Sequence, residues 1–349
     1  IEMDEEKVIS LIEKRVISNN NSIFREELVS AIHDSFQRLI NPSLQREIRK
    51  MLSERAEAHA IDVFSRNLKA LLMTPPVDDK IILGIDPGFR TGCKVAAIDA
   101  TGKYLEGGTI YPHPPQKRYE EAKDTIHGFI KRHNVDIIAI GNGTASRETE
   151  QLVAELIEEI PEKVLYAIVN EAGASVYSAS KVAKKEFPDL EASLRGNISI
   201  ARRLLDPLSE LVKIDPKSIG VGLYQHDVNQ NNLSKELDQV VESCVNQVGV
   251  NLNTASASLL KYVSGISSRV AERIVTFREE NGLFKNRSSL MDVKGLGDHS
   301  FTQAAGFLRI PESDVFFDRT AVHPESYEAA QSLLANLNIS LDALHKTPQ

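Results

Sequence analysis

The chain has few cysteines and no long hydrophobic run. These two shortages argue against a disulfide-rich secreted protein and against a membrane-spanning protein. Its two cysteines, Cys93 and Cys244, are too few for a disulfide-stapled secreted fold and suit a reducing compartment. No apolar stretch approaches the roughly 18 residues that a membrane-spanning helix needs. The acidic start, residues 1–6, lacks the apolar core of a signal peptide. We therefore expect a cytoplasmic protein that does not insert into a membrane.

Positive charge is also in short supply. With 41 Lys and Arg against 49 Asp and Glu, the formal net charge is −8, so no global positive field attracts nucleic acid. Any nucleic-acid binding must come from a local basic patch. The length of 349 residues suggests two or three domains, and an isoleucine at position 1 suggests a piece of a longer protein.

Residues 1–79 carry apolar side chains at helical spacing and predict a helical scaffold region. Asn41 and Pro42 indicate an N-cap followed by proline at the first helical position. The helix that starts there is expected to carry apolar residues along one side as far as Leu72 and to end before Pro75. Counted together with Arg38 just before it, its basic residues outnumber its acidic ones by seven to four, which favours a solvated face over a nucleic-acid surface.

Residues 80–206 change from three strands joined by short loops to alternating helices and strands. The first strand, residues 81–85, is apolar and ends on Asp86. We expect it at the centre of a mixed five-stranded sheet, antiparallel to residues 95–98 and parallel to residues 137–140. This order, with an acid ending the first strand, resembles the ribonuclease-H superfold. The predicted fold class is multidomain α plus α/β, a ribonuclease-H-like mixed sheet flanked by helical domains.

The carboxylates of this domain predict a degenerate nuclease site. Nucleases of the superfold hold two metal ions between three or four carboxylates. Here only Asp86 and Glu171 stand at such positions, because strand four ends on the amide Asn142 and Arg195 lies where the last helix would supply an acid. We expect Asp86 and Glu171 to be vestigial, with no metal, no cofactor and no enzymatic activity.

Two other interpretations fit parts of this domain. Residues 86–92 resemble the phosphate hairpin of actin-type ATPases, but no second lobe with its own hairpin is found in the sequence. Residues 141–146 lie between a strand and a helix, as a dinucleotide fingerprint does. That fingerprint lacks its third glycine here, and Glu171 lies thirty residues past Gly141 where about twenty is expected.

Residues 207–240 are predicted as a connector, and residues 241–310 as a tandem helix-hairpin-helix domain. Asn253 is expected to cap a helix near the start of that domain. Gly265 and Gly295 then mark two glycine turns thirty residues apart, each followed by a predicted helix. The repeat indicates two copies of one hairpin.

The glycines of these hairpins suggest phosphate binding. A glycine lets a nucleic-acid phosphate reach backbone N–H groups and the start of the next helix, and such contact reads no sequence. Gly297 is expected to have a positive φ, so that valine there would strain the turn. The first hairpin is expected to bind less well, because Ser267 replaces its second glycine. The predicted nucleic-acid-binding residues are Lys261, Gly265, Ser267, Arg269, Lys294, Gly295, Gly297 and His299.

The local charge agrees with this hypothesis. Residues 251–310 contain eight Lys and Arg against five Asp and Glu, which leaves +3 on an acidic chain. Residues 311–349 are predicted as a C-terminal helical segment that packs on the rest, with its last helix from His323 through Leu337.

Four stretches of the sequence together resemble one family. They are Gly84-Ile85-Asp86-Pro87-Gly88-Phe89-Arg90-Thr91-Gly92-Cys93-Lys94, Ile140-Gly141-Asn142-Gly143-Thr144-Ala145, Asn170-Glu171-Ala172-Gly173-Ala174-Ser175 and Leu223-Tyr224-Gln225-His226-Asp227-Val228. The chain is similar through them to the bacterial Tex family of transcription accessory proteins, which is related to a eukaryotic transcription elongation factor. The resemblance implies a central helical region, a YqgF-type resolvase-like domain, tandem helix-hairpin-helix motifs and a cytoplasmic, transcription-linked role. Family members usually add an N-terminal helical segment and a C-terminal OB-type RNA-binding module, and neither is evident here.

Three hypotheses follow for function. The first is a monomeric nucleic-acid-binding transcription accessory protein with an inactive nuclease-like domain. The second is a metal-dependent, structure-specific nuclease that uses Asp86 and Glu171. The third is a scaffold that contacts RNA polymerase or the ribosome. The sequence leaves open whether RNA or DNA is preferred.

Overall fold

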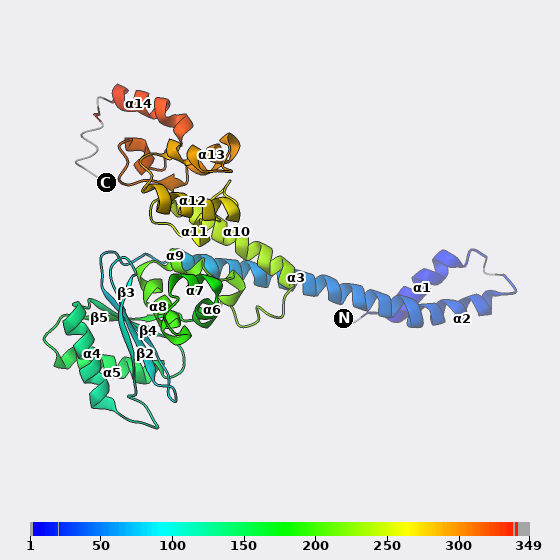
Figure 1. The fold of residues 1–349 in the computed structure, drawn as a ribbon. Helices are drawn as coiled ribbons and strands as arrows, with labels where there is room; N and C mark the ends of the chain where they lie inside the picture. The colour runs from blue at the N-terminus through cyan, green and yellow to red at the C-terminus, as the bar shows by residue number, and fades with distance from the viewer. Residues whose placement is uncertain (1–2, 20, 338, 341–349) are drawn as a thin grey trace. The chain divides into compact units, whose positions relative to one another are not determined.

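The computed structural model describes residues 3–19, 21–337 and 339–340. The chain divides into two compact units, residues 1–63 with 225–229 and residues 64–224 with 230–349. Helices and a single larger sheet make up most of it (Figure 1). No helix in the described part of the chain is both long enough and apolar enough to cross a membrane.

The first unit is helical. Helix α1 (Glu5–Val16) begins after Asp4, whose carboxylate accepts a hydrogen bond from the Lys7 amide at 3.0 Å and caps the helix. Helix α2 (Arg25–Ser35) packs against it. The buried apolar residues of this unit include Ile9, Ile32 and Phe36.

The expected N-cap at Asn41 is wrong. A π-helical turn, Phe36–Ile40, joins α2 to α3 (Asn41–Leu72), and Asn41 has helical φ and ψ of −58° and −49°. Pro42 therefore lies inside a continuous helix, where its ring would crowd the carbonyl of Arg38 in a regular α-helical turn. The wider π turn relieves that crowding, which explains why the proline does not end the helix.

The apolar side expected along α3 is buried only toward its end. Phe64, Leu68 and Leu72 are buried. Four earlier apolar residues are between 36% and 62% exposed: Leu44, Ile48, Met51 and Leu52.

The second unit contains the predicted mixed sheet. Its five strands are β1 (Ile82–Asp86), β2 (Cys93–Ile98), β3 (Tyr104–Ile110), β4 (Ile137–Gly141) and β5 (Leu165–Val169). They lie in the order β3-β2-β1-β4-β5, with β1 antiparallel to β2 and parallel to β4. The predicted central position of β1 and both of its predicted neighbours are confirmed. Because β1 is covered on both faces, all of its residues except Asp86 are buried.

Helices cover both faces of the sheet. Helices α4 (Tyr119–His133) and α5 (Ser146–Glu159) pack on the face that carries Leu83 and Ile85. Helices α6 (Ala174–Ala179) and α8 (Ala192–Leu205) pack on the other face. Ser180 ends α6 and caps the next helix, α7 (Lys181–Glu186).

The rest of the second unit consists of one long helix, α10 (Gln230–Val248), and a series of shorter elements. These elements are α9 (Pro207–Leu211), a 3-10 turn (Pro216–Ser218), α10 (Gln230–Val248), β6 (Val250–Asn251), α11 (Ala257–Leu260), α12 (Ser268–Asn281), a 3-10 helix (Arg287–Asp292), α13 (Asp298–Ala305), β7 (Leu308–Arg309), two 3-10 turns (Phe316–Arg319 and Pro324–Ser326) and α14 (Tyr327–Asn336). Helix α10 begins inside the range predicted as a connector, although Leu233, Leu237 and Val241 carry its helical spacing. Asn253 is not a helix cap, because its amide side chain pairs with the backbone of Phe284 at 2.9 and 3.1 Å.

Candidate functional site

Asp86 lies where the sequence predicted, at the end of the central strand. It is partly buried and pairs in register with Lys94 of β2. Burial, assisted by the charge of Glu171, raises its pKa from 3.8 to about 6, while Lys94 opposes the shift. Asp86 therefore binds a proton far more readily than an exposed aspartate.

This shift predicts how stability depends on pH. Between about pH 4 and pH 6 the folded chain binds more protons at Asp86 than the unfolded chain does, so stability falls as pH rises through that window. Replacing Asp86 with Asn should therefore stabilise the second unit at pH 8, by up to about 3 kcal/mol from the shift of 3.8 to 6, and hardly at pH 4. Urea unfolding of both proteins at the two pH values checks this, and an equal effect at both would contradict it.

Glu171 lies across the loop that follows β4. A Cβ atom built on Gly141 or on Gly143 would collide with its carboxylate oxygens, and Oε2 is buried without a hydrogen-bond partner among the described residues. Asn142 fixes this arrangement, because its Oδ1 accepts a hydrogen bond from the Glu171 amide at 3.1 Å. The two glycines thus make room for a carboxylate. This disfavours the dinucleotide interpretation, since a negative group occupies the space that a pyrophosphate would need.

The arginine close to Glu171 is not the predicted one. Arg195 points elsewhere and donates to the carbonyl of Phe187 at 3.4 Å. Arg203, also on α8, is 6% exposed and donates to the carbonyls on either side of Glu171, those of Asn170 and Ala172, at 2.7 Å each. Burial lowers the pKa of Arg203, and the negative charges of Glu210 and Glu171 oppose that shift.

The α8 side chain that lies on β1 is an amide. Asn197 is fully buried and donates to the carbonyl of Gly84 at 3.1 Å. A Cβ atom on Gly84 would come within 2.9 Å of the Asn197 side chain, so the glycine permits this close contact. Within the described residues, no group of three or more His, Cys, Asp or Glu could hold a metal ion. Two carboxylates compensated by Lys94 and Arg203 offer a poor environment for two divalent ions.

The hairpin region contains one turn made twice. The carbonyl of Val263 accepts a hydrogen bond from the Ile266 amide at 3.0 Å, and that of Val293 accepts one from the Leu296 amide at 3.1 Å. The glycine in each turn has positive φ, +83° at Gly265 and +92° at Gly295. The predicted repeat of thirty residues is therefore present in the backbone.

Both turn glycines lie beside the other hairpin, and Gly295 is also exposed to solvent. A Cβ atom on Gly265 would lie 2.8 Å from the carbonyl oxygen of Ser300 in α13. A Cβ atom on Gly295 would collide with the guanidinium of Arg273 in α12, which donates to the carbonyl of Lys294 at 2.8 Å. Each hairpin turn thus packs against the helix of the other hairpin. Positive φ favours glycine at both positions, and at Gly265 the close approach of the Ser300 carbonyl requires it as well.

Gly297 is the glycine that leaves open space. Its φ is −99° and its ψ 171°, so the predicted positive φ is wrong and valine would not strain the backbone there. Nothing lies within 4 Å of a Cβ atom at this position. Among the described residues, none accepts a hydrogen bond from the amides of Gly297, Asp298 and His299 at the start of α13.

The equivalent position in the first hairpin is Ser267. Its hydroxyl accepts a hydrogen bond from the Val270 amide at 3.4 Å and caps α12. Within the described chain, the amides of Ser268 and Arg269 find no acceptor. Both hairpins therefore present free N–H groups at a helix start, and the serine keeps that feature in the first one.

Part of the predicted positive patch is used in packing. Arg273, Arg278 and Arg287 donate to backbone carbonyls within the domain. Asp298 adds an exposed carboxylate at the first position of α13. The exposed cations are Lys261, Arg269, Lys285 and Lys294.

Comparison with known proteins links this sheet and these hairpins to one family. Residues 80–205 match the model of the Tex protein YqgF-like domain, and residues 245–309 match that of the helix-hairpin-helix motif. The transcriptional accessory protein Tex of Neisseria gonorrhoeae is 53% identical over 299 residues, which are 85% of this chain and 39% of that protein. YdcI of Bacillus subtilis is 52% identical over 342 residues, 98% of this chain and 48% of that protein. The chain is a Tex-family sequence.

More distant relatives carry other names. The human S1 RNA-binding domain-containing protein 1 is 49% identical over 286 residues, 81% of this chain and 28% of that protein. The chain thus spans about half or less of the length of these curated relatives. A solved structure of T. thermophilus RuvC in complex with Holliday junction substrate covers 35% of this chain and 90% of that chain at 17% identity. Its TM-score of 0.27 is too low to support an argument about either molecule.

A third family model matches the C-terminal segment of this Tex-family chain. Residues 316–349 match a model described as HHH domain, where the sequence had indicated only a packing helix. Arg287, 1% exposed, joins its described part to the second hairpin through hydrogen bonds with the carbonyls of Leu308, Thr320 and Val322. The hydroxyl of Tyr327 accepts a further bond at 2.7 Å. The sequence pattern could not predict that Arg287 joins these segments, because a buried arginine cannot be told from an exposed one by its spacing.

Proposed function

We propose that this chain is the part of a Tex-family transcription accessory protein that binds nucleic acid, through phosphate contacts at its two hairpins and without reading sequence. The observation that carries the proposal is the repeated turn that ends in free amides at Gly297 and at Ser268. Free N–H groups at a helix start attract a phosphate oxygen, and Lys294 supplies a nearby cation. Both RNA and DNA carry such phosphates, so the hairpins by themselves do not choose between them.

Charge reversal at Lys294 tests the proposal. Lys294→Glu should weaken binding to single-stranded RNA and to duplex DNA alike and should lower the salt slope of log K by about 0.7 to 0.9, the change expected for one lost phosphate contact. Lys184→Glu, the same change at an exposed lysine of α7, is the matched control. Circular dichroism verifies that both variants fold. Unchanged affinity and slope in Lys294→Glu would remove this hairpin from the binding surface.

A second variant, Asp298→Ser, is expected to strengthen binding. Asp298→Ser places in the second hairpin the residue that the first has at Ser268, and it removes a carboxylate beside the free amides. Binding should therefore become tighter if phosphate approaches this helix start.

We also propose that the YqgF-like domain is not a nuclease. Asn142 and Arg203 hold Glu171 in place, and two carboxylates leave a metal pair without charge compensation. The expected result is no cleavage of linear or branched DNA or RNA in magnesium or manganese. Cleavage that Asp86→Asn abolishes would instead establish the alternative, a metal-dependent nuclease. If neither binding nor cleavage is found, the remaining hypothesis is a scaffold for RNA polymerase or the ribosome.

A further inference from the structure

The edge strand β5 has an unpaired side. The Leu165 amide donates to Asp136 at 3.0 Å and the Val169 carbonyl accepts from Asn142 at 3.0 Å, so these residues point their backbone groups toward β4. Alternation along the strand then turns the N–H and C=O groups of Tyr166 and Ile168 to the outer edge. No described residue hydrogen-bonds to those four groups.

This edge lacks the usual protection against pairing. Leu165, Tyr166 and Ile168 are 69%, 40% and 45% exposed. The strand contains no charge, no proline and no bulge, the devices by which proteins blunt a sheet edge. It offers backbone partners and apolar side chains together, as strands that accept an added peptide strand do.

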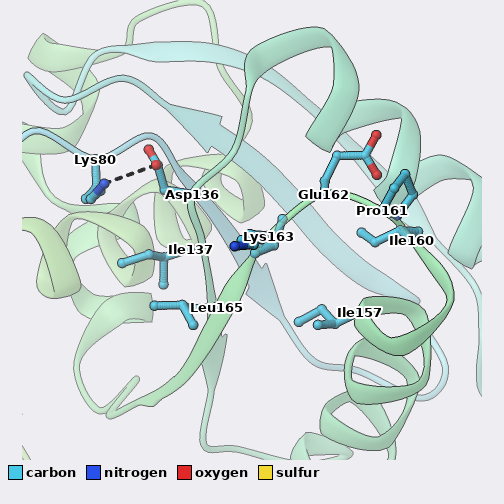
Figure 2. A pocket seen from close by; sticks show the side chains of 10 residues that line it. Lys80, Asp136, Ile137, Ile157, Ile160, Pro161, Glu162, Lys163 and Leu165 are labelled. Carbon is cyan, nitrogen blue, oxygen red and sulfur yellow. Dashed lines mark hydrogen bonds and ion pairs between the residues drawn. The ribbon is translucent and has the colours of Figure 1, made fainter.

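A surface pocket of about 610 Å³ lies at the N-terminal end of the same strand (Figure 2). Its apolar lining comes from Ile137, Ile157, Ile160, Pro161, Val164 and Leu165. Lys80 pairs with Asp136 at 3.1 Å, and Glu162 contacts His127 at 3.0 Å. Lys163 is exposed and forms no ion pair with any described residue, and Figure 2 shows its ammonium pointing away from Ile157 and Ile160, toward the side of the pocket where Ile137 lies.

We propose that β5 and this pocket bind the extended C-terminal end of a protein partner as an added antiparallel strand. The added strand runs in the opposite direction to β5. Its C-terminal residue therefore lies beside the N-terminal end of β5, where Lys163 and the pocket are. An apolar final side chain fits the lining, and the terminal carboxylate meets the unpaired ammonium of Lys163. This protein contact goes beyond the proposed nucleic-acid binding and does not depend on it.

A second copy of β5 fits the edge but not the pocket. Antiparallel pairing centred on Ala167 places Tyr166 opposite Ile168 of the copy, and it brings Asn170 and Glu171 of the copy to the pocket end. Asn170 is not apolar, and the Glu171 carboxylate lies against its own Gly141 and Gly143. Self-pairing therefore leaves Lys163 and the apolar lining without a partner.

The test uses three synthetic peptides and the full chain. The first is a short peptide of alternating threonine and valine that ends in leucine with a free carboxylate. The second is its C-terminal amide, and the third is N-methylated at alternate residues so that it cannot pair with an edge. Fluorescence anisotropy of labelled peptides measures binding, and hydrogen exchange reports on the amides of Tyr166 and Ile168.

The carboxylate peptide should bind, and the amide should bind at least tenfold more weakly. The N-methylated peptide should not bind. Lys163→Glu should lower the affinity for the carboxylate peptide at least tenfold and leave the affinity for the amide peptide unchanged. The control Lys181→Glu should change neither affinity. The amides of Tyr166 and Ile168 should exchange more slowly in the complex.

Three results would overturn the proposal. One is no binding of the carboxylate peptide at about 1 mM, a weak affinity by the standards of peptide recognition. Another is binding that tolerates N-methylation or Lys163→Glu. The third is concentration-dependent dimerisation in sedimentation that Tyr166→Lys abolishes, because the edge would then belong to a second copy.

Discussion

Replacing Arg287 with methionine is expected to lower the free energy of unfolding of the hairpin region by at least about 3 kcal/mol, because several buried carbonyl groups lose their donors at about 1–3 kcal/mol each. The guanidinium of Arg287 donates to Leu308 at 2.7 Å, to Val322 at 2.7 Å and to Thr320 at 2.5 Å. Methionine matches the volume but carries no donor. Urea unfolding measures the loss.

The same substitution would also disturb a buried carboxylate. Asp318 is 3% exposed and accepts hydrogen bonds from the Arg287 amide and from the Tyr327 hydroxyl. Burial and the bond to Asp318 raise the pKa of Tyr327 to about 12. Without the guanidinium nearby, this carboxylate loses the positive charge that offsets its burial. The described end of the chain should then become sensitive to proteases.

Two controls separate the geometry of Arg287 from its charge. Arg269→Met, at an exposed position of α12, should change stability by less than about 0.5 kcal/mol. Arg287→Lys keeps the charge but cannot reach carbonyls on three sides, so it should be nearly as unstable as the methionine variant. A stable Arg287→Lys protein would show that charge, not the shape of the guanidinium, holds this segment.

Valine at the two glycines of the second hairpin should have opposite consequences. Gly295→Val should destabilise the domain by roughly 1–3 kcal/mol from backbone strain alone, since its φ is +92°, and should also displace Arg273. Gly297→Val should cost no more than about 1 kcal/mol, the usual loss from a poor helix cap. It should instead weaken nucleic-acid binding at least tenfold, because the valine side chain covers the free amides of α13. Thermal unfolding and binding titrations of the same preparations distinguish the two.

Much of the fold could be predicted because hydrophobic pattern and topology agree. The β-branched run at residues 81–85 fixes a central strand, and the helical spacings of α4 and α5 fix the layer above it. The errors lie where pattern and context disagree. Pro42 looks like a helix start, but a π turn carries the helix through it. Helix α10 begins in a polar stretch whose apolar residues are widely spaced.

The candidate sites were less predictable, because they depend on contacts between distant residues. The sequence could place Asp86 and Glu171 near one sheet edge, but not the fit of Glu171 over Gly141 and Gly143. It offered Arg195 where the structure uses Arg203, a difference of about two helical turns on α8.

The hairpin glycines illustrate the same limit. Both Gly265 and Gly297 read as open positions in the sequence, yet a Cβ atom on Gly265 would meet the helix of the other hairpin, whereas one on Gly297 would meet nothing within 4 Å. Residue type indicates that close approach is needed, but not which neighbour approaches.

The most direct test of the account is the affinity of Gly297→Val for a single-stranded RNA and a duplex DNA, relative to the unaltered chain at one salt concentration. The variant should bind both at least tenfold more weakly, with a thermal midpoint close to that of the unaltered chain. Binding that stays unchanged in a folded Gly297→Val protein would contradict it, because the amides at the start of α13 could then not be where a phosphate is held.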